Sequence, residues 1–164
     1  MSKVELTIER LQSHEDPCCR GGDLLLVFAL SYRARIIRFR RERHEIVPVV
    51  ETSSRSFEMA SFDSFLAGRW MNYYKRLGGV VHPEKQGDFI AKIGNGTARF
   101  RFDIAQPNSK FFAGLTVIES TIKRKDCVAL FDEYELSISS FYKRSLQRLK
   151  SSWKSWVGKR SLRK

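Results

Sequence analysis

Apolar side chains recur at steps of three and four along the last third of the chain. Acidic residues occupy the first turns of this stretch, and only basic charges follow them, an order that suits the helix dipole at both ends. Positions three and four apart share one side of a helix, so the pattern predicts a long amphipathic helix over about residues 131–157. Its apolar stripe consists of Phe131, Tyr134, Ile138, Tyr142, Leu146, Leu149, Trp153 and Trp156.

A second helical pattern covers about residues 62–77. Ser61 suits the N-cap position, and Gly78-Gly79 suits a C-terminal stop. Phe65 and Tyr74 widen the apolar face, which favours a well-covered core helix over an exposed aromatic surface. The stripe itself comprises Phe62, Leu66, Trp70, Tyr73 and Leu77.

Strand-like alternation and turn signals dominate the first fifty residues. Val4, Leu6 and Ile8 alternate with polar residues, which is typical of a half-buried strand. Turn-forming residues indicate a loop over 12–22. The apolar run that follows, 24–32, is interpreted as a central strand, with a buried helix segment as the alternative. Residues 33–43 alternate in a way that favours a strand, although helical spacing fits them as well.

Residues 88–104 have the pattern of a β-hairpin. With Asn95-Gly96 at the centre of a two-residue turn, apolar residues face one another across the pair. The predicted pairs on that face are Ile93 with Ala98, Ala91 with Phe100, and Phe89 with Phe102. The same register places Lys92 opposite Arg99, a repulsive arrangement that either a bound anion or solvent alone would screen.

Further strands are predicted at residues 46–50, with Pro48 at a sheet edge, at 115–122 and at 127–130. Together the patterns predict an α+β fold with a mostly antiparallel sheet and two main helices, at about 62–77 and 131–157. A chain of 164 residues suits one domain, expected over residues 1–157. Residues 158–164 are expected to form a disordered basic tail.

The net charge of +12 is held in two blocks. Residues 33–43 carry six arginines and one glutamate, which gives +5, and residues 136–164 carry nine basic residues and no acid, which gives +9. The remainder sums to −2. A concentrated positive field selects polyanionic partners, which can be nucleic acid, an anionic membrane surface or an acidic protein.

Catalytic or metal-binding patterns are weak in this sequence. His14, Cys18 and Cys19 lack the paired spacing of a zinc site, and no nucleophile motif accompanies the other histidines. We therefore expect no metal, no cofactor and no enzymatic activity. Three cysteines form no disulfide framework and favour a reducing location, cytoplasmic or nuclear. The longest apolar run has seven residues, too few to span a bilayer.

Basic residues beside aromatic ones suggest the function. Arginine clamps phosphates and stacks on exposed bases, so we expect a nucleic-acid-binding protein that favours RNA or single strands. One alternative is an interaction module for an acidic partner, or for self-association through Trp153 and Trp156. Another is peripheral attachment to an anionic membrane through the C-terminal helix. The expected nucleic-acid contacts are Arg33, Arg35, Arg38, Arg40, Arg41, Arg43, Lys92, Arg99, Arg101, Lys143, Arg144, Arg148, Lys150 and Lys154.

Overall fold

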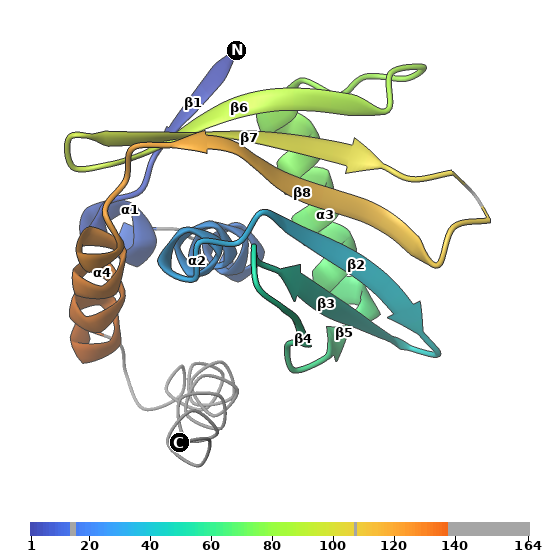
Figure 1. Ribbon diagram of the computed structural model, residues 1–164, viewed down its shortest axis with the longest axis horizontal. Helices are drawn as coiled ribbons and strands as arrows, with labels where there is room; N and C mark the ends of the chain where they lie inside the picture. The colour runs from blue at the N-terminus through green and yellow to red at the C-terminus, as the bar shows by residue number, and fades with distance from the viewer. Residues whose placement is uncertain (14–15, 107, 138–164) are drawn as a thin grey trace.

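The computed structural model describes residues 1–13, 16–106 and 108–137 of the 164-residue chain. Within these residues, eight strands form one sheet (Figure 1). The order is β1-β6-β7-β8-β2-β3-β4, with β5 beside β3, and every neighbouring pair except β1–β6 is antiparallel. The expected α+β class with a mostly antiparallel sheet is therefore confirmed. The strands are β1 (Ser2–Glu5), β2 (Ile36–Glu42), β3 (Glu45–Glu51), β4 (Ser56–Glu58), β5 (Phe62–Asp63), β6 (Gln86–Ile93), β7 (Gly96–Ile104) and β8 (Phe111–Ser120).

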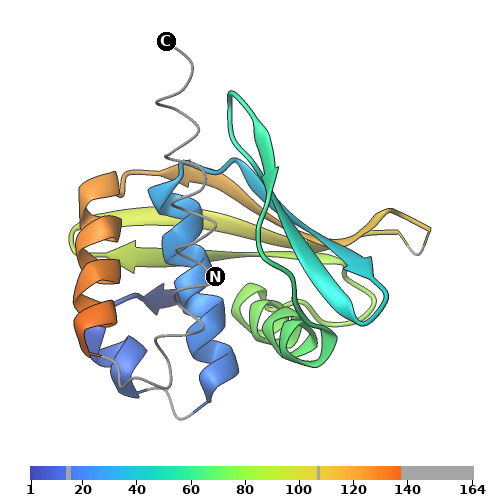
Figure 2. The same cartoon turned by 90° about the horizontal axis from the view of Figure 1, so that it is seen from below.

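Four helices lie within the same described residues. They are α1 (Ile8–Ser13), α2 (Pro17–Ser31), α3 (Ser64–Gly78) and α4 (Arg124–Ser137). Helix α2 packs against both α3 and α4, and α2 and α4 lie in front of the yellow strands of the sheet in Figure 2. The expectation of two main helices is only partly correct, because α2 replaces a predicted strand.

The helices and one face of the sheet enclose the core. Side chains of a strand alternate between its two faces, so every second residue of the central strands points toward the helices. Phe39 in β2, Phe89 in β6, Phe100 in β7 and Leu115 in β8 are completely buried on this inner face. Helix α4 contributes Tyr134, which is also buried. The opposite face of the same strands carries the charged residues.

The apolar run Leu24–Leu30 lies in helix α2, so the favoured central strand is wrong and the alternative of a buried helix segment is correct. All seven residues are buried, because α2 lies between α3 and α4 and shares one core cluster with the sheet. A helix that is buried on all sides has no polar face, so its sequence lacks the helical periodicity that would identify it.

The predicted loop over residues 12–22 is also wrong, and two glycines explain the error. Gly21 and Gly22 lie inside α2, where a Cβ on Gly21 would sit 2.7 Å from Nε1 of Trp70 and one on Gly22 would sit 2.7 Å from Cδ1 of Tyr73. They allow α2 and α3 to approach closely instead of forming a turn. The helix begins at Asp16-Pro17, where the Asp16 carboxylate accepts a hydrogen bond from the Cys18 N–H at 2.9 Å.

Strands β6 and β7 form the predicted hairpin in a register that differs from the prediction. The turn is Gly94-Asn95, with a φ of 56° at Gly94. A shift of two residues leaves every side chain on its predicted face, so apolar matching could not distinguish the two registers. Lys92 lies opposite Thr97, and the predicted Lys92–Arg99 repulsion does not exist. The inward pairs are Ile93 with Gly96, Ala91 with Ala98, and Phe89 with Phe100.

Among the other strands, β2 confirms the strand interpretation within residues 33–43, and β8 covers most of the strand predicted at 115–122. The first strand ends at Glu5, and Ile8 begins α1 instead of continuing the alternation. Pro48 lies within β3, opposite Phe39 of β2. On the other side of β3, β4 has ended and β5 has not begun, so the missing N–H of Pro48 falls at a local edge of the sheet.

Helix α3 matches its prediction except at its start. The N-cap is Asp63 and not Ser61, because the Asp63 carboxylate accepts a hydrogen bond from the Phe65 N–H at 2.8 Å. Phe65 is 72% exposed and does not belong to the inner face. Gly79 ends the helix with a φ of 64°, in agreement with the predicted stop.

Helix α4 begins at Arg124, so residues 127–130 are helical and the strand predicted there is wrong. The predicted helix over 131–157 agrees with α4 as far as Ser137. The rest of that helix and the predicted tail at 158–164 lie outside the described residues.

Candidate functional site

Five of the predicted contact residues form ion pairs on the outer face of the sheet. Nε of Arg38 lies 3.1 Å from Glu51, and the guanidinium of Arg40 lies 2.6 Å from both Glu42 and Glu58. Nζ of Lys92 lies 3.2 Å from Glu5, and Arg99 and Arg101 share Asp88. Five cations therefore meet five carboxylates, and this face carries little net charge.

Asp88 holds the two arginines of β7. Nε of Arg101 donates to Asp88 at 2.7 Å, and Nε of Arg99 donates to it at 3.0 Å. Hydrogen bonds from Arg101, and then from Arg99, lower the pKa of Asp88 to about 2. The observed register places Asp88 directly opposite Arg101 and Ile90 opposite Arg99. Asp88 thus neutralises Arg99, the residue for which the sequence had suggested a screening anion.

Arg33, Arg35, Arg41 and Arg43 are exposed and form no ion pair within the described part of the chain. Arg33 and Arg43 have φ values of 54° and 53°, since both occupy turns next to β2. Arg35 precedes the same strand, and Arg41 lies near its end. The charge of this block that no acid neutralises is therefore found at the two ends of β2.

A groove of about 460 Å³ lies between α3 and the ends of β2, β7 and β8. Arg41, Arg69 and Lys75 line it, and the described residues of its lining include no carboxylate. The Arg41 guanidinium lies 5.4 Å from the ring centroid of Phe112, a cation–π contact, and Arg69 lies 5.9 Å from that of Phe65. The apolar part of the lining comprises Phe65, Met71, Phe102, Ile104, Phe112 and Ala113.

A second cavity, of about 320 Å³, lies at the other end of β2. Among the residues that the structure describes, three cations, Arg33, Arg55 and Arg124, and no carboxylate line it. Hydroxyl groups from residues 31–32 and 52–54 complete the lining. Oγ1 of Thr52 accepts hydrogen bonds from the N–H groups of Ser54 and Arg55, each at 3.3 Å, and so holds the loop in shape.

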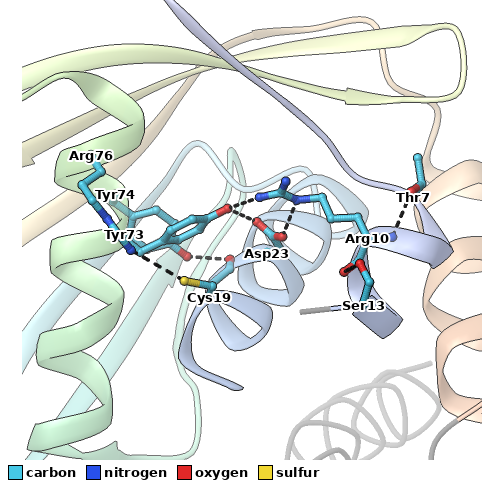
Figure 3. A network of polar contacts seen from close by, with 9 residues as sticks. Thr7, Arg10, Ser13, Cys19, Asp23, Tyr73, Tyr74 and Arg76 are labelled. Atoms are coloured by element: carbon cyan, nitrogen blue, oxygen red, sulfur yellow. Dashed lines mark hydrogen bonds and ion pairs between the residues drawn. The ribbon is translucent and has the colours of Figure 1, made fainter. Parts of the chain in front are cut away.

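A buried polar network joins α1, α2 and α3 (Figure 3). Arg10 donates to Asp23 at 2.8 Å and to the Tyr73 hydroxyl at 2.9 Å, and Tyr73 donates to the other oxygen of Asp23. Asp23 is completely buried, and burial followed by the charge of Asp23 raises the pKa of Tyr73. The three groups bind one another, and none of them lines either cavity. We interpret this network as a structural link between the helices.

The cysteines are poorly placed for chemistry. Burial raises the pKa of the Cys18 and Cys19 thiols, and it raises that of Cys127 to about 11. Protonated thiols are weak nucleophiles and weak metal ligands. Within residues 1–13, 16–106 and 108–137, no three His, Cys, Asp or Glu side chains are arranged to hold a metal ion.

Four cations of the cavities were not identified from the sequence, and they are Arg55, Arg69, Lys75 and Arg124. The two in α3 could have been found, because Phe65, Arg69, Asn72 and Lys75 recur at steps of four, three and three and so share one exposed stripe. No such pattern marks Arg55 and Arg124, since separate segments bring them together. The predicted site residues that lie outside the described part of the chain are Lys143, Arg144, Arg148, Lys150, Trp153, Lys154 and Trp156.

No protein-family model and no curated protein sequence matches this chain. Across the described ranges, no helix is both long and apolar enough to cross a lipid bilayer. The function must therefore be inferred from the chemistry of the two cavities and from the distribution of charge.

Proposed function

We propose that this protein is a non-enzymatic nucleic-acid-binding protein that favours RNA or single strands. The observation that carries this proposal is the lining of the two cavities, each of which has three cationic side chains and no carboxylate among its described residues. The planar guanidinium group matches the geometry of phosphate oxygens, and no acid in either lining repels a bound anion.

The C-terminal segment supplies attraction that does not depend on sequence. Residues 138–164 hold nine basic residues and no acid, so they carry +9 of the net +12. Cations that neutralise phosphates release counterions, and this release drives non-specific binding to nucleic acid. The outer face of the sheet contributes less, because the five predicted contacts on it are each paired with a carboxylate.

The preference for single strands rests on the shape of the cavities. Bases in a duplex are stacked and paired, whereas those of a single strand can turn into a recess and contact apolar or aromatic side chains. The groove beside α3 offers such a recess next to its cations.

Fluorescence anisotropy with a labelled single-stranded oligoribonucleotide tests the proposal. The affinity of the full chain should fall log-linearly with salt, with a slope of about −0.7 for each phosphate contacted. A duplex of the same sequence should bind more weakly. If the oligonucleotide does not bind, and the chain instead binds vesicles of anionic lipid or self-associates independently of salt, the proposal is wrong.

A further inference from the structure

We propose that the groove between α3 and the ends of β2, β7 and β8 holds one nucleotide of a single strand. Its phosphate would bind Arg41 and Lys75, and its base would enter the apolar recess beside Phe112 and Ile104. This assignment rests on the proposed nucleic-acid binding and gives it a defined subsite.

The groove combines the two properties that a nucleotide requires. Its volume of about 460 Å³ lies in the range of cavities that hold small ligands, and it accommodates one unstacked base with its phosphate. Phe102, Ala113 and Met71 are buried and form an apolar floor. A flat apolar group that carries an anion therefore fits this lining better than a fully hydrated anion does.

The cations come from opposite walls of the groove. Arg41 lies near the end of β2, and Lys75 lies in the last turns of α3. Neither forms an ion pair within the described residues, whereas Arg69 lies 3.1 Å from Asp16. The phosphate is therefore assigned to Arg41 and Lys75, and Arg69 contributes to the field around them.

Gly68 keeps the groove open. It lines the groove from α3, and a Cβ placed on it would meet no atom within 4 Å. Glycine disfavours a helix, yet neither close packing nor a positive φ requires it at this position. Because Gly68 has no side chain, the groove remains open beside it.

Two other occupants fit less well. Residues 138–164 of the same chain carry nine basic residues, so the three cations of the groove would repel them. An acidic amphipathic helix would match the charge, but it binds through side chains spread over two turns and needs an elongated apolar groove. A single recess of this size matches one inserted group better than a row of them.

The substitution Gly68→Leu tests the assignment, with Gly68→Ala as its matched control. Leucine extends into the open space and narrows the groove, whereas alanine leaves it open, and both residues favour the helix. Uridine 5′-monophosphate would be titrated into the full-length chain and followed by amide chemical shifts. The parent and the alanine variant should bind it, and the leucine variant should lose that binding.

Separate titrations with uridine and with inorganic phosphate identify which part of the nucleotide is held. Each should bind more weakly than the nucleotide, because each uses only half of the subsite. Lys75→Gln should weaken binding of the nucleotide and of phosphate but leave uridine unaffected. This variant also keeps the proposal testable if Gly68→Leu does not fold. A nucleotide that binds no better than inorganic phosphate would overturn the assignment of the base.

An abasic single strand separates this inference from the proposed function. The parent chain should prefer the normal oligonucleotide over the abasic one by about five- to 150-fold, the range expected for one stacked base, and Gly68→Leu should lose that preference. If the oligonucleotide binds and the leucine and alanine variants are identical, the groove assignment fails while the proposed function stands. If the nucleotide binds the groove but no oligonucleotide binds, the proposed function fails instead. If Gly68→Leu abolishes the binding of an acidic peptide but leaves the binding of the nucleotide unchanged, the groove binds a protein partner and the assignment is wrong.

Discussion

Replacing Gly22 with alanine should destabilise this fold, whereas the same substitution at Gly68 should stabilise it. Both glycines lie within helices, where alanine is favoured over glycine by about 0.8–1 kcal/mol. At Gly68 the added Cβ would meet nothing within 4 Å. The unfolding free energy of Gly68→Ala should therefore rise by about 1 kcal/mol.

At Gly22 the added Cβ would lie 2.7 Å from Cδ1 and 3.1 Å from Cε1 of Tyr73. The Tyr73 ring cannot move aside freely, because its hydroxyl is bound to Arg10 and to the buried carboxylate of Asp23. Forcing an extra methyl group into such a contact costs about 1–3 kcal/mol. After subtraction of the gain in helix propensity, Gly22→Ala should be less stable than the parent by about 0–2 kcal/mol.

Urea denaturation followed by tryptophan fluorescence measures both variants against the parent. The two unfolding free energies should differ by about 1–3 kcal/mol, with unchanged dependence on urea concentration. If Gly22→Ala is as stable as Gly68→Ala, then α2 and α3 do not approach each other closely at Gly22, and the explanation given for the paired glycines is wrong.

Three further predictions concern single positions. Tyr73→Phe should lower the unfolding free energy by about 1–3 kcal/mol in the same assay, because it removes the hydroxyl that donates to the buried carboxylate of Asp23. An unchanged unfolding free energy would mean that the network is not structural. Gly94→Val should lower the unfolding free energy by about 1–3 kcal/mol and reduce the melting temperature, because a β-branched residue would have to adopt the φ of 56° in the hairpin turn. A melting temperature equal to that of the parent would place the turn elsewhere. Asp88, whose pKa is lowered to about 2, stabilises the fold fully above its unfolded pKa of about 3.9 and loses that contribution as the pH falls toward 2. Asp88→Asn should therefore show a smaller loss of stability between those pH values than the parent, and an equal loss would exclude Asp88 as the responsible group.

The sequence predicted the elements whose apolar residues follow one clear period. Helix α3, strand β2 and the β6–β7 hairpin have a buried and an exposed face, and their patterns identified them. Helix α2 has no exposed face along Leu24–Leu30, so its pattern carried no period. Its glycines were read as turn residues, because only the tertiary contacts with Trp70 and Tyr73 explain them.

The candidate site was less predictable for two physical reasons. A register shift of two residues preserves the faces of a hairpin, so the sequence did not reveal that Asp88 neutralises Arg99 and Arg101. The cavities combine residues distant in the chain, as where Arg41 of β2 meets Lys75 of α3. Charge counting identified the positive block at 33–43 but could not show that Arg38 and Arg40 are paired within it.

Our main claim is that C-terminal cations, and not the outer sheet face, attract nucleic acid. The most direct test measures how oligonucleotide binding depends on salt in two charge variants of the full chain. One variant is Lys150→Gln with Lys154→Gln, and the other is Asp88→Asn with Arg99→Gln and Arg101→Gln, which leaves no carboxylate unpaired. The C-terminal pair should reduce the slope of log affinity against log salt by about 1.4, and the sheet variant by no more than about 0.7. A sheet variant that reduces the slope as much as the C-terminal pair, or a parent chain that binds no oligonucleotide, would contradict this division of roles.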